Sequence, residues 1–173
     1  PVSDTLEADY NATERTLTIG ANKASGVLTG ESLTLNGATI KGTNVGDYTT
    51  VANNYTWSVA KANGNDSTDN YTLSVSGKLT IKAVDGLTIT NESTSQDYNG
   101  QALTANATGA AADNSNVTIK YAVKGEDGIY GAWSETAPSI TDAGVLTYKV
   151  QASNPNYNTV EDTTEYTLTV RKL

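Results

Sequence analysis

The chain has 173 residues and a net charge of −8, and it contains no Cys, His, Met or Phe. This length suits one large domain or two small ones. Without His and Cys, the commonest metal ligands, nucleophile partners and near-neutral proton carriers are missing, which argues against an enzyme and leaves no catalytic, metal or cofactor site to expect. The 11 basic residues are scattered among 19 acidic ones, so nucleic acid is not an expected partner.

No apolar run approaches the roughly 20 residues that a membrane-spanning helix needs, so we expect no membrane insertion of this segment. No signal peptide or lipidation motif is recognisable. The chain opens without Met and stops after a strand-like run, which we interpret as an excerpt from a longer protein. The lack of Cys indicates that the chain folds without disulfide bonds.

Short runs of alternating apolar and polar residues predict β-strands throughout. In chain order, the clearest runs are residues 55–59 (YTWSV), 71–75 (YTLSV), 78–82 (KLTIK), 87–90 (LTIT), 117–121 (VTIKY), 146–151 (LTYKVQ) and 165–171 (EYTLTVR). This period gives each strand one buried and one wet face, as in antiparallel sandwiches. The pattern therefore predicts an all-β fold.

Gly- and Asn-rich breaks between these runs predict turns. Asn36-Gly37 is typical of a tight type I′ hairpin, in which both central residues need a positive φ. The one Ala-rich stretch, Ala105–Asp113, is short and broken by Gly109, so we interpret it as a loop or a single turn. A helix at that place would instead give β-grasp-like modules, which is the alternative fold.

An internal repeat divides the chain. Asp9-Tyr10-Asn11 returns as Asp97-Tyr98-Asn99, 88 residues later. The run at 70–75 matches the run at 165–170, 95 residues later, which implies about seven extra residues inside the second copy. We place the boundary near residues 83–86, giving modules at 1–85 and 86–173. The short linker predicts a stiff rod.

The repeated Asp-Tyr-Asn triplet has two interpretations. An Asp beside a Tyr could bind a sugar or transfer a proton, and such a pair occurs at Asp9 and Tyr10 and again at Asp97 and Tyr98. The same residues also favour an Asx turn, in which the polar side chain accepts a hydrogen bond from the local backbone while the Tyr anchors the entering strand. A folding device is copied into both modules more readily than a site is, so we favour the turn.

Several anchors, in order, resemble a known class of repeats. In the second copy they are Tyr98-Asn99-Gly100, Val117–Tyr121, Trp133-Ser134, Ala137-Pro138, Thr141–Gly144, Asn156-Tyr157-Asn158 and Tyr166–Val170. This copy resembles the mostly-β, glycine-rich (MBG) repeats of bacterial surface proteins and adhesins. The first copy is similar to the related repeats that open with Tyr-Asp-Gly. It keeps Gly46-Asp47-Tyr48, Asp69-Asn70-Tyr71 and Leu79-Thr80-Ile81, but opens with Tyr10-Asn11-Ala12.

The resemblance implies immunoglobulin-like β modules of a secreted protein attached to the cell surface or cell wall, with no catalytic residues. Two tandem immunoglobulin-like antiparallel β-sandwich modules are therefore the expected architecture. The expected role is a stalk or spacer in a bacterial cell-surface protein, in which a monomer contacts neighbouring repeats of the same chain.

The best ligand-binding candidates are Tyr130 and Trp133, in a Gly-bounded segment that is longer in the second copy. Aromatic rings between glycines can stack on carbohydrate, so the alternative function is a carbohydrate- or mucin-binding adhesin module whose partners are host or microbial glycans and glycoproteins. The competing interpretation is a hairpin whose Trp packs over the sheet edge.

Two further possibilities concern Ca²⁺ and a covalent crosslink. Residues 63–69 (NGNDSTD) are rich in oxygen ligands but lack the calcium-loop spacing, so a solvated turn is favoured. A Lys–Asn amide crosslink has its ingredients in Lys82, Lys120 and Asn116, though ordinary surface lysines are favoured.

Overall fold

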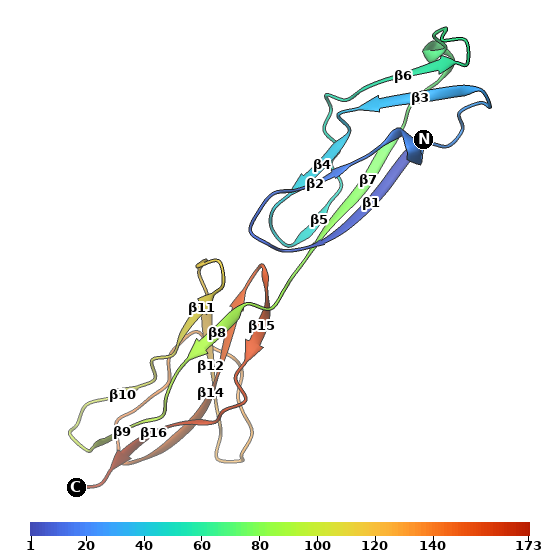
Figure 1. Cartoon of the computed structure of the whole chain (residues 1–173). Helices are drawn as coiled ribbons and strands as arrows, with labels where there is room; N and C mark the ends of the chain where they lie inside the picture. Colours follow the sequence, from blue (N-terminus) through green and yellow to red (C-terminus); the bar gives the residue numbers. More distant parts are fainter. The chain divides into compact units, whose positions relative to one another are not determined.

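The computed structural model describes all 173 residues and divides them into two compact units, Pro1–Ala83 and Val84–Leu173 (Figure 1). The sequence-based boundary lies two residues further along the chain. Sixteen strands and two short 3-10 helices make up the regular structure. The predicted all-β fold class is confirmed, with the strands divided between two tandem units. No helix is long and apolar enough to cross a membrane.

The first unit contains seven strands and both 3-10 helices. They are β1 (Val2–Asp9), β2 (Arg15–Thr18), η1 (Ala21–Lys23), β3 (Glu31–Asn36), β4 (Thr39–Gly42), β5 (Gly46–Tyr48), β6 (Thr56–Lys61), η2 (Thr68–Asn70) and β7 (Val75–Lys82). The sheet β1-β7-β5 packs against the pair β2-β4, and β3 pairs with β6. The interface between the two layers is hydrophobic, since Leu17 and Ile40 from one layer and Leu79 and Ile81 from the other are all buried.

The second unit contains nine strands. They are β8 (Leu87–Thr90), β9 (Thr94–Asp97), β10 (Leu103–Thr104), β11 (Thr108–Ala111), β12 (Thr118–Val123), β13 (Ser139–Ile140), β14 (Gly144–Asn154), β15 (Tyr157–Glu161) and β16 (Tyr166–Arg171). The main sheet has the order β12-β14-β16-β9, with β15 also paired to β14. The pairs β8-β11 and β10-β13 supply Ile89, Leu103 and Ile140 to the opposite side of the core.

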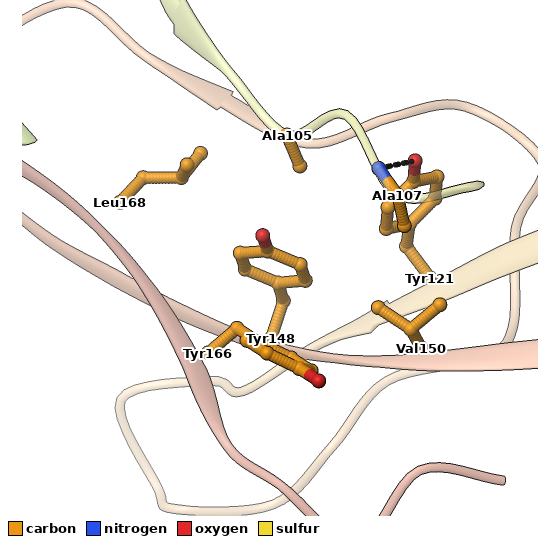
Figure 2. Close-up of a cluster of buried hydrophobic side chains, with 7 residues drawn as sticks. All are labelled: Ala105, Ala107, Tyr121, Tyr148, Val150, Tyr166 and Leu168. Atoms are coloured by element: carbon orange, nitrogen blue, oxygen red, sulfur yellow. Dashed lines mark hydrogen bonds between the residues drawn. The ribbon is translucent and has the colours of Figure 1, made fainter. Parts of the chain in front are cut away.

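Tyrosines fill the core of the second unit (Figure 2). The rings of Tyr121 and Tyr148 have centroids 5.9 Å apart, and those of Tyr148 and Tyr166 are 5.8 Å apart. Each hydroxyl has a partner: Tyr121 accepts the Ala107 N–H at 3.0 Å, Tyr148 accepts the Asn91 amide at 3.0 Å, and Tyr166 donates to the Asp162 carboxylate. These bonds matter because a buried hydroxyl left unpaired costs about 1–3 kcal/mol.

Each unit is closed by a parallel pairing between its opening and closing strands, which the sequence did not predict. In the first unit β1 runs parallel to β7, with Asp9 beside Lys82. In the second unit β9 runs parallel to β16, with Asp97 beside Arg171. The remaining strand pairs are antiparallel.

This register corrects the repeat alignment. The closing strands match at Leu79–Lys82 and Leu168–Arg171, which is a spacing of 89 residues rather than 95. The segment Tyr71–Ser74, expected to be strand, lies before β7 and belongs to no ladder. The error arose because a two-residue period matches itself at several shifts, and only the pairing partner selects one.

Two other local expectations were wrong. Asn36-Gly37 does not close a hairpin, because β3 pairs with β6 and β4 with β2, and only Gly37 has a positive φ. Ala105–Asp113 is neither a loop nor a helix, since it contains β11. A Cβ at Gly109 would lie 2.7 Å from a Val117 methyl, so the glycine permits close strand packing instead of breaking structure. The alternative of β-grasp-like modules required a helix at this place, so it is wrong as well.

The Asp-Tyr-Asn triplets form the same device in both units. The N–H of Tyr10 donates to the Lys82 carbonyl and that of Tyr98 to the Arg171 carbonyl, each at 2.9 Å. These bonds extend the parallel ladder by one residue beyond β1 and β9. The favoured interpretation of the triplet as a folding element is therefore confirmed.

An Asx turn follows each of these Tyr residues. The Asn11 side-chain oxygen accepts the Thr13 N–H at 3.1 Å, and the Asn99 oxygen accepts the Gln101 N–H at 2.9 Å. The residue between is left-handed in both copies, with φ 61° at Ala12 and 77° at Gly100. The first unit thus makes the same turn with a residue that is strained there.

This matched pair gives a stability prediction. Ala12→Gly relieves the left-handed strain, and Gly100→Ala introduces it, so the first should stabilise its unit and the second destabilise its unit by about 1 kcal/mol each. Urea unfolding of the full chain, with a probe in each unit, measures both effects. Equal and negligible shifts for both variants would show that the turn conformation is not as described.

Candidate functional site

The segment that holds Tyr130 and Trp133 forms a hairpin on the edge of β12. Lys124 and Tyr130 bridge, and the Gly125 N–H donates to the Ile129 carbonyl at 2.8 Å. Gly128 has a φ of 79°, which the tight turn requires. The returning segment pairs with β12, since Tyr121 and Ser134 exchange two backbone hydrogen bonds of 2.8 and 2.9 Å. Both candidate aromatic residues are therefore held by backbone pairing.

Lys149 brings the two rings together. It lies in β14 between Tyr148 and Val150, which face the core with no exposed surface, so alternation points Lys149 to the outer face. Its ammonium nitrogen is 4.7 Å from the ring centroid of Tyr130 and 5.0 Å from that of Trp133. Both distances lie within cation–π range. We call Tyr130, Trp133 and Lys149, with Glu165 and Lys124 described next, the aromatic cluster.

A carboxylate anchors the polar end of Tyr130. The hydroxyl donates to Glu165 Oε1 at 2.6 Å, and the Lys124 ammonium donates to the same oxygen at 2.9 Å. Burial and the adjacent carboxylate raise the pKa of Tyr130 to about 12. The hydrogen bonds from Tyr130 and Lys124 lower the pKa of Glu165. The cluster thus combines the side chains of two lysines, one glutamate and one tyrosine hydroxyl.

Contacts within the chain therefore explain the positions of both aromatic rings without a bound ligand. Each presents a face to Lys149, so those faces are not free to stack on a sugar. An open depression of about 320 Å³ lies beside the cluster, lined by Tyr130, Lys149 and the residues 161–165. Its walls offer carboxylates and hydroxyls next to one ring. The cluster is well suited to fixing the hairpin over the outer face of the sheet.

Sequence reasoning selected the two aromatic residues but missed their polar partners. The outward position of Lys149 could have been found from the two-residue period beside Tyr148. Glu165 and Lys124 carried no such signal, because their contact depends on the ladders that bring β12, β14 and β16 together.

The other candidates have local roles. In the segment 63–69, Asp66 accepts hydrogen bonds from the Thr68 hydroxyl and N–H at 2.6 and 2.9 Å, which describes a turn. No group of three or more Asp, Glu, His or Cys residues is arranged to hold a metal ion. Lys82, considered for a crosslink, is half exposed and lies 3.4 Å from a Glu7 oxygen.

Of the comparisons with known proteins, only the one with solved structures found similar chains. No protein-family model and no curated protein matches the chain. Fibronectin(III)-like modules of CbhA from Clostridium thermocellum are 14% identical, with 98% of this chain and 90% of that one covered at a TM-score of 0.38. Tandem Ig repeats of Dlar are 10% identical, with 98% and 95% covered at a TM-score of 0.35. These similarities are too low to bear on function.

The pKa of Tyr130 predicts a pH dependence. Because the pKa is raised in the folded state, the contribution of Tyr130 to stability is complete below the ordinary value of 10.0 and is lost as the pH rises towards about 12. Tyr130→Phe should therefore lose less stability than the wild type over this window. Urea unfolding at several alkaline pH values measures the difference, with Tyr98→Phe as a control at an exposed tyrosine. Parallel curves for wild type and Tyr130→Phe would contradict the described contact.

Proposed function

We propose that the chain is a pair of structural repeat modules that act as a stalk or spacer in an extracellular, surface-attached bacterial protein. The observation that carries this proposal is the parallel pairing of opening and closing strands in both units. A spacer is loaded through its chain ends, and this pairing determines how each unit meets that load.

In the first unit the load enters at the start of β1 and leaves at the end of β7. Since these strands are parallel and paired over their full lengths, from Val2 beside Val75 to Asp9 beside Lys82, tension drags one along the other. All the ladder hydrogen bonds then bear the load together instead of opening one by one. The pairing of β9 with β16 gives the second unit the same geometry.

The junction between the units supports the same role. The Lys82 carbonyl is bonded within the first unit to Tyr10, and the Val84 carbonyl accepts the Asn158 N–H at 2.9 Å within the second. Asn158 also donates to Asp85 Oδ1 at 2.8 Å. Only Ala83 separates the two anchored positions, so the connection contributes almost no slack.

Single-molecule pulling tests the proposal. The chain has no Cys, so one introduced Cys gives a unique attachment point for a pulling handle. Pulling the first unit between its N-terminus and Ala83→Cys shears the β1-β7 ladder, whereas pulling between the N-terminus and Ser74→Cys peels the same ladder from one end. The shear geometry should need a several-fold higher force. Equal forces in the two geometries would remove the basis for a load-bearing spacer.

Carbohydrate binding at the aromatic cluster is the second candidate, favoured by the depression that Tyr130 and Lys149 line. It predicts glycan-array signals that Trp133→Ala abolishes while Ile129→Ala, an exposed residue of the same hairpin, preserves them. The absence of any signal, or equal signals for all three proteins, would contradict it.

A further inference from the structure

The chain contains three Asn-Gly pairs that can undergo the same covalent reaction, at Asn36, Asn63 and Asn99. In this reaction the backbone nitrogen of the glycine attacks Cγ of the asparagine side chain and closes a five-membered succinimide ring. The reaction is intramolecular, so the freedom and position of that nitrogen decide its rate. Glycine favours it, because no Cβ hinders the approach. The structure distinguishes the three pairs by what holds this nitrogen.

At Asn99 the attacking nitrogen is free and the attacked carbon is activated. The Gly100 N–H makes no hydrogen bond within the chain. Both residues are exposed, and a Cβ at Gly100 would meet no atom within 4 Å. The Asn99 side-chain oxygen accepts hydrogen bonds from the Gln101 N–H at 2.9 Å and the Gln96 amide at 3.5 Å. These donors stabilise the negative charge that develops on this oxygen when the nitrogen attacks.

Asn63 forms the same turn, but the nitrogen that follows it is engaged. The Asn63 side-chain oxygen accepts the Asn65 N–H at 3.0 Å, and Gly64 has a φ of 84°, close to the 77° of Gly100. The Gly64 N–H, however, donates to the Lys61 carbonyl at 2.8 Å. This hydrogen bond must break before the nitrogen can lose its proton and attack, so the reaction is slower at Asn63.

Asn36 is held by the sheet. It is the last residue of β3 and is paired with Thr56 of β6. The residues on either side of this Asn-Gly pair, Leu35 and Ala38, are buried. The backbone of Asn36 therefore cannot rotate to bring the glycine nitrogen to Cγ without opening the end of the ladder.

Asn11 has the surroundings of Asn99 but is followed by Ala12. Its side-chain oxygen accepts the Thr13 N–H at 3.1 Å and the Thr13 hydroxyl at 2.7 Å. Ala12 is left-handed like Gly100, and its N–H makes no hydrogen bond within the chain. The methyl group of Ala12 is thus the main difference between the two turns, and it hinders the attack at Asn11.

We propose that Asn99 is a self-modification site, at which the turn after β9 deamidates while the other two Asn-Gly pairs are protected by the fold. The Gly100 nitrogen loses its proton and forms a bond to Asn99 Cγ. The bond from Cγ to Nδ2 breaks, and the amide nitrogen takes up a proton and leaves as ammonia. Water then opens the succinimide at either carbonyl, which gives aspartate or isoaspartate. Water is the sole co-reactant.

The products change the end of the ladder in the second unit. Isoaspartate adds one methylene group to the main chain directly after Tyr98, whose N–H donates to the Arg171 carbonyl. Either product adds a negative charge two residues from Asp97, which pairs with Arg171 at 2.7 Å. The modification therefore loosens the last bond of this ladder. It is independent of the spacer role, since it concerns the covalent chemistry of one turn.

Ageing of the full chain at mildly alkaline pH, followed by peptide mapping with mass spectrometry, tests the proposal. Each deamidation adds about 1 Da, because an amide NH₂ group becomes OH, and a zero-time sample corrects for reaction during digestion. In urea the three Asn-Gly pairs should react at similar rates. In the folded chain Asn99 should stay close to its rate in urea, whereas Asn36 and Asn63 should be slowed several-fold. No reaction at Asn99, or equal folded rates at all three, would overturn the proposal.

Two variants move the site from one unit to the other. Gly100→Ala should lower the folded rate at Asn99 to that of Asn11 in the wild type. Ala12→Gly should raise the folded rate at Asn11 towards that of Asn99 and several-fold above those of Asn36 and Asn63. A rate at Asn11 that stays as low as at those two protected pairs would overturn the assignment to this turn.

Hydrogen exchange measures the consequence for the ladder. The Tyr98 amide should exchange faster in the aged wild-type chain than in the fresh chain, while the Tyr10 amide of the unmodified first unit serves as the internal control and should not change. Unchanged exchange at Tyr98 in the deamidated fraction would overturn the loosening of the ladder.

Discussion

The parallel ladder between the opening and closing strand of each unit is the constraint on which the rest of this structure depends. It joins residues about 73 positions apart in the first unit, from Val2 and Val75 to Asp9 and Lys82. Once formed, it fixes which face of β7 meets β2 and β4, because a shift by one residue would turn Leu79 and Ile81 outward. The Asp-Tyr-Asn triplet ends this ladder with one more backbone bond and an Asx turn.

The two units reach a closed core with different residues. The first relies on aliphatic side chains from two facing layers. The second places three tyrosines at its centre and supplies a partner for each hydroxyl, including a backbone N–H and the amide of Asn91. Polar partners of this kind specify one arrangement of the core, since other packings would leave a buried hydroxyl unpaired.

The sequence predicts the all-β class and most strands because alternation is a local property. It predicts the turn at Asp97-Tyr98-Asn99 for the same reason, and the repeat pointed to its copy at Asp9. It fails at strand partners: the run at 71–75 alternates as well as the run at 78–82, yet only the latter pairs throughout. At the aromatic cluster, the local sequence identified Tyr130 and Trp133. Glu165, 35 residues from Tyr130 along the chain, is brought to it only by the registers of β12 with β14 and of β14 with β16.

Amide hydrogen exchange at Tyr10 and Tyr98 tests the central claim most directly. These two N–H groups donate to the carbonyls of Lys82 and Arg171, at the far end of each parallel ladder. If the ladder closes each unit, both amides exchange only when their own unit unfolds, with the same free energy as core amides of β7 and β16. Exchange as fast as that of the exposed turn amides that follow would contradict this account.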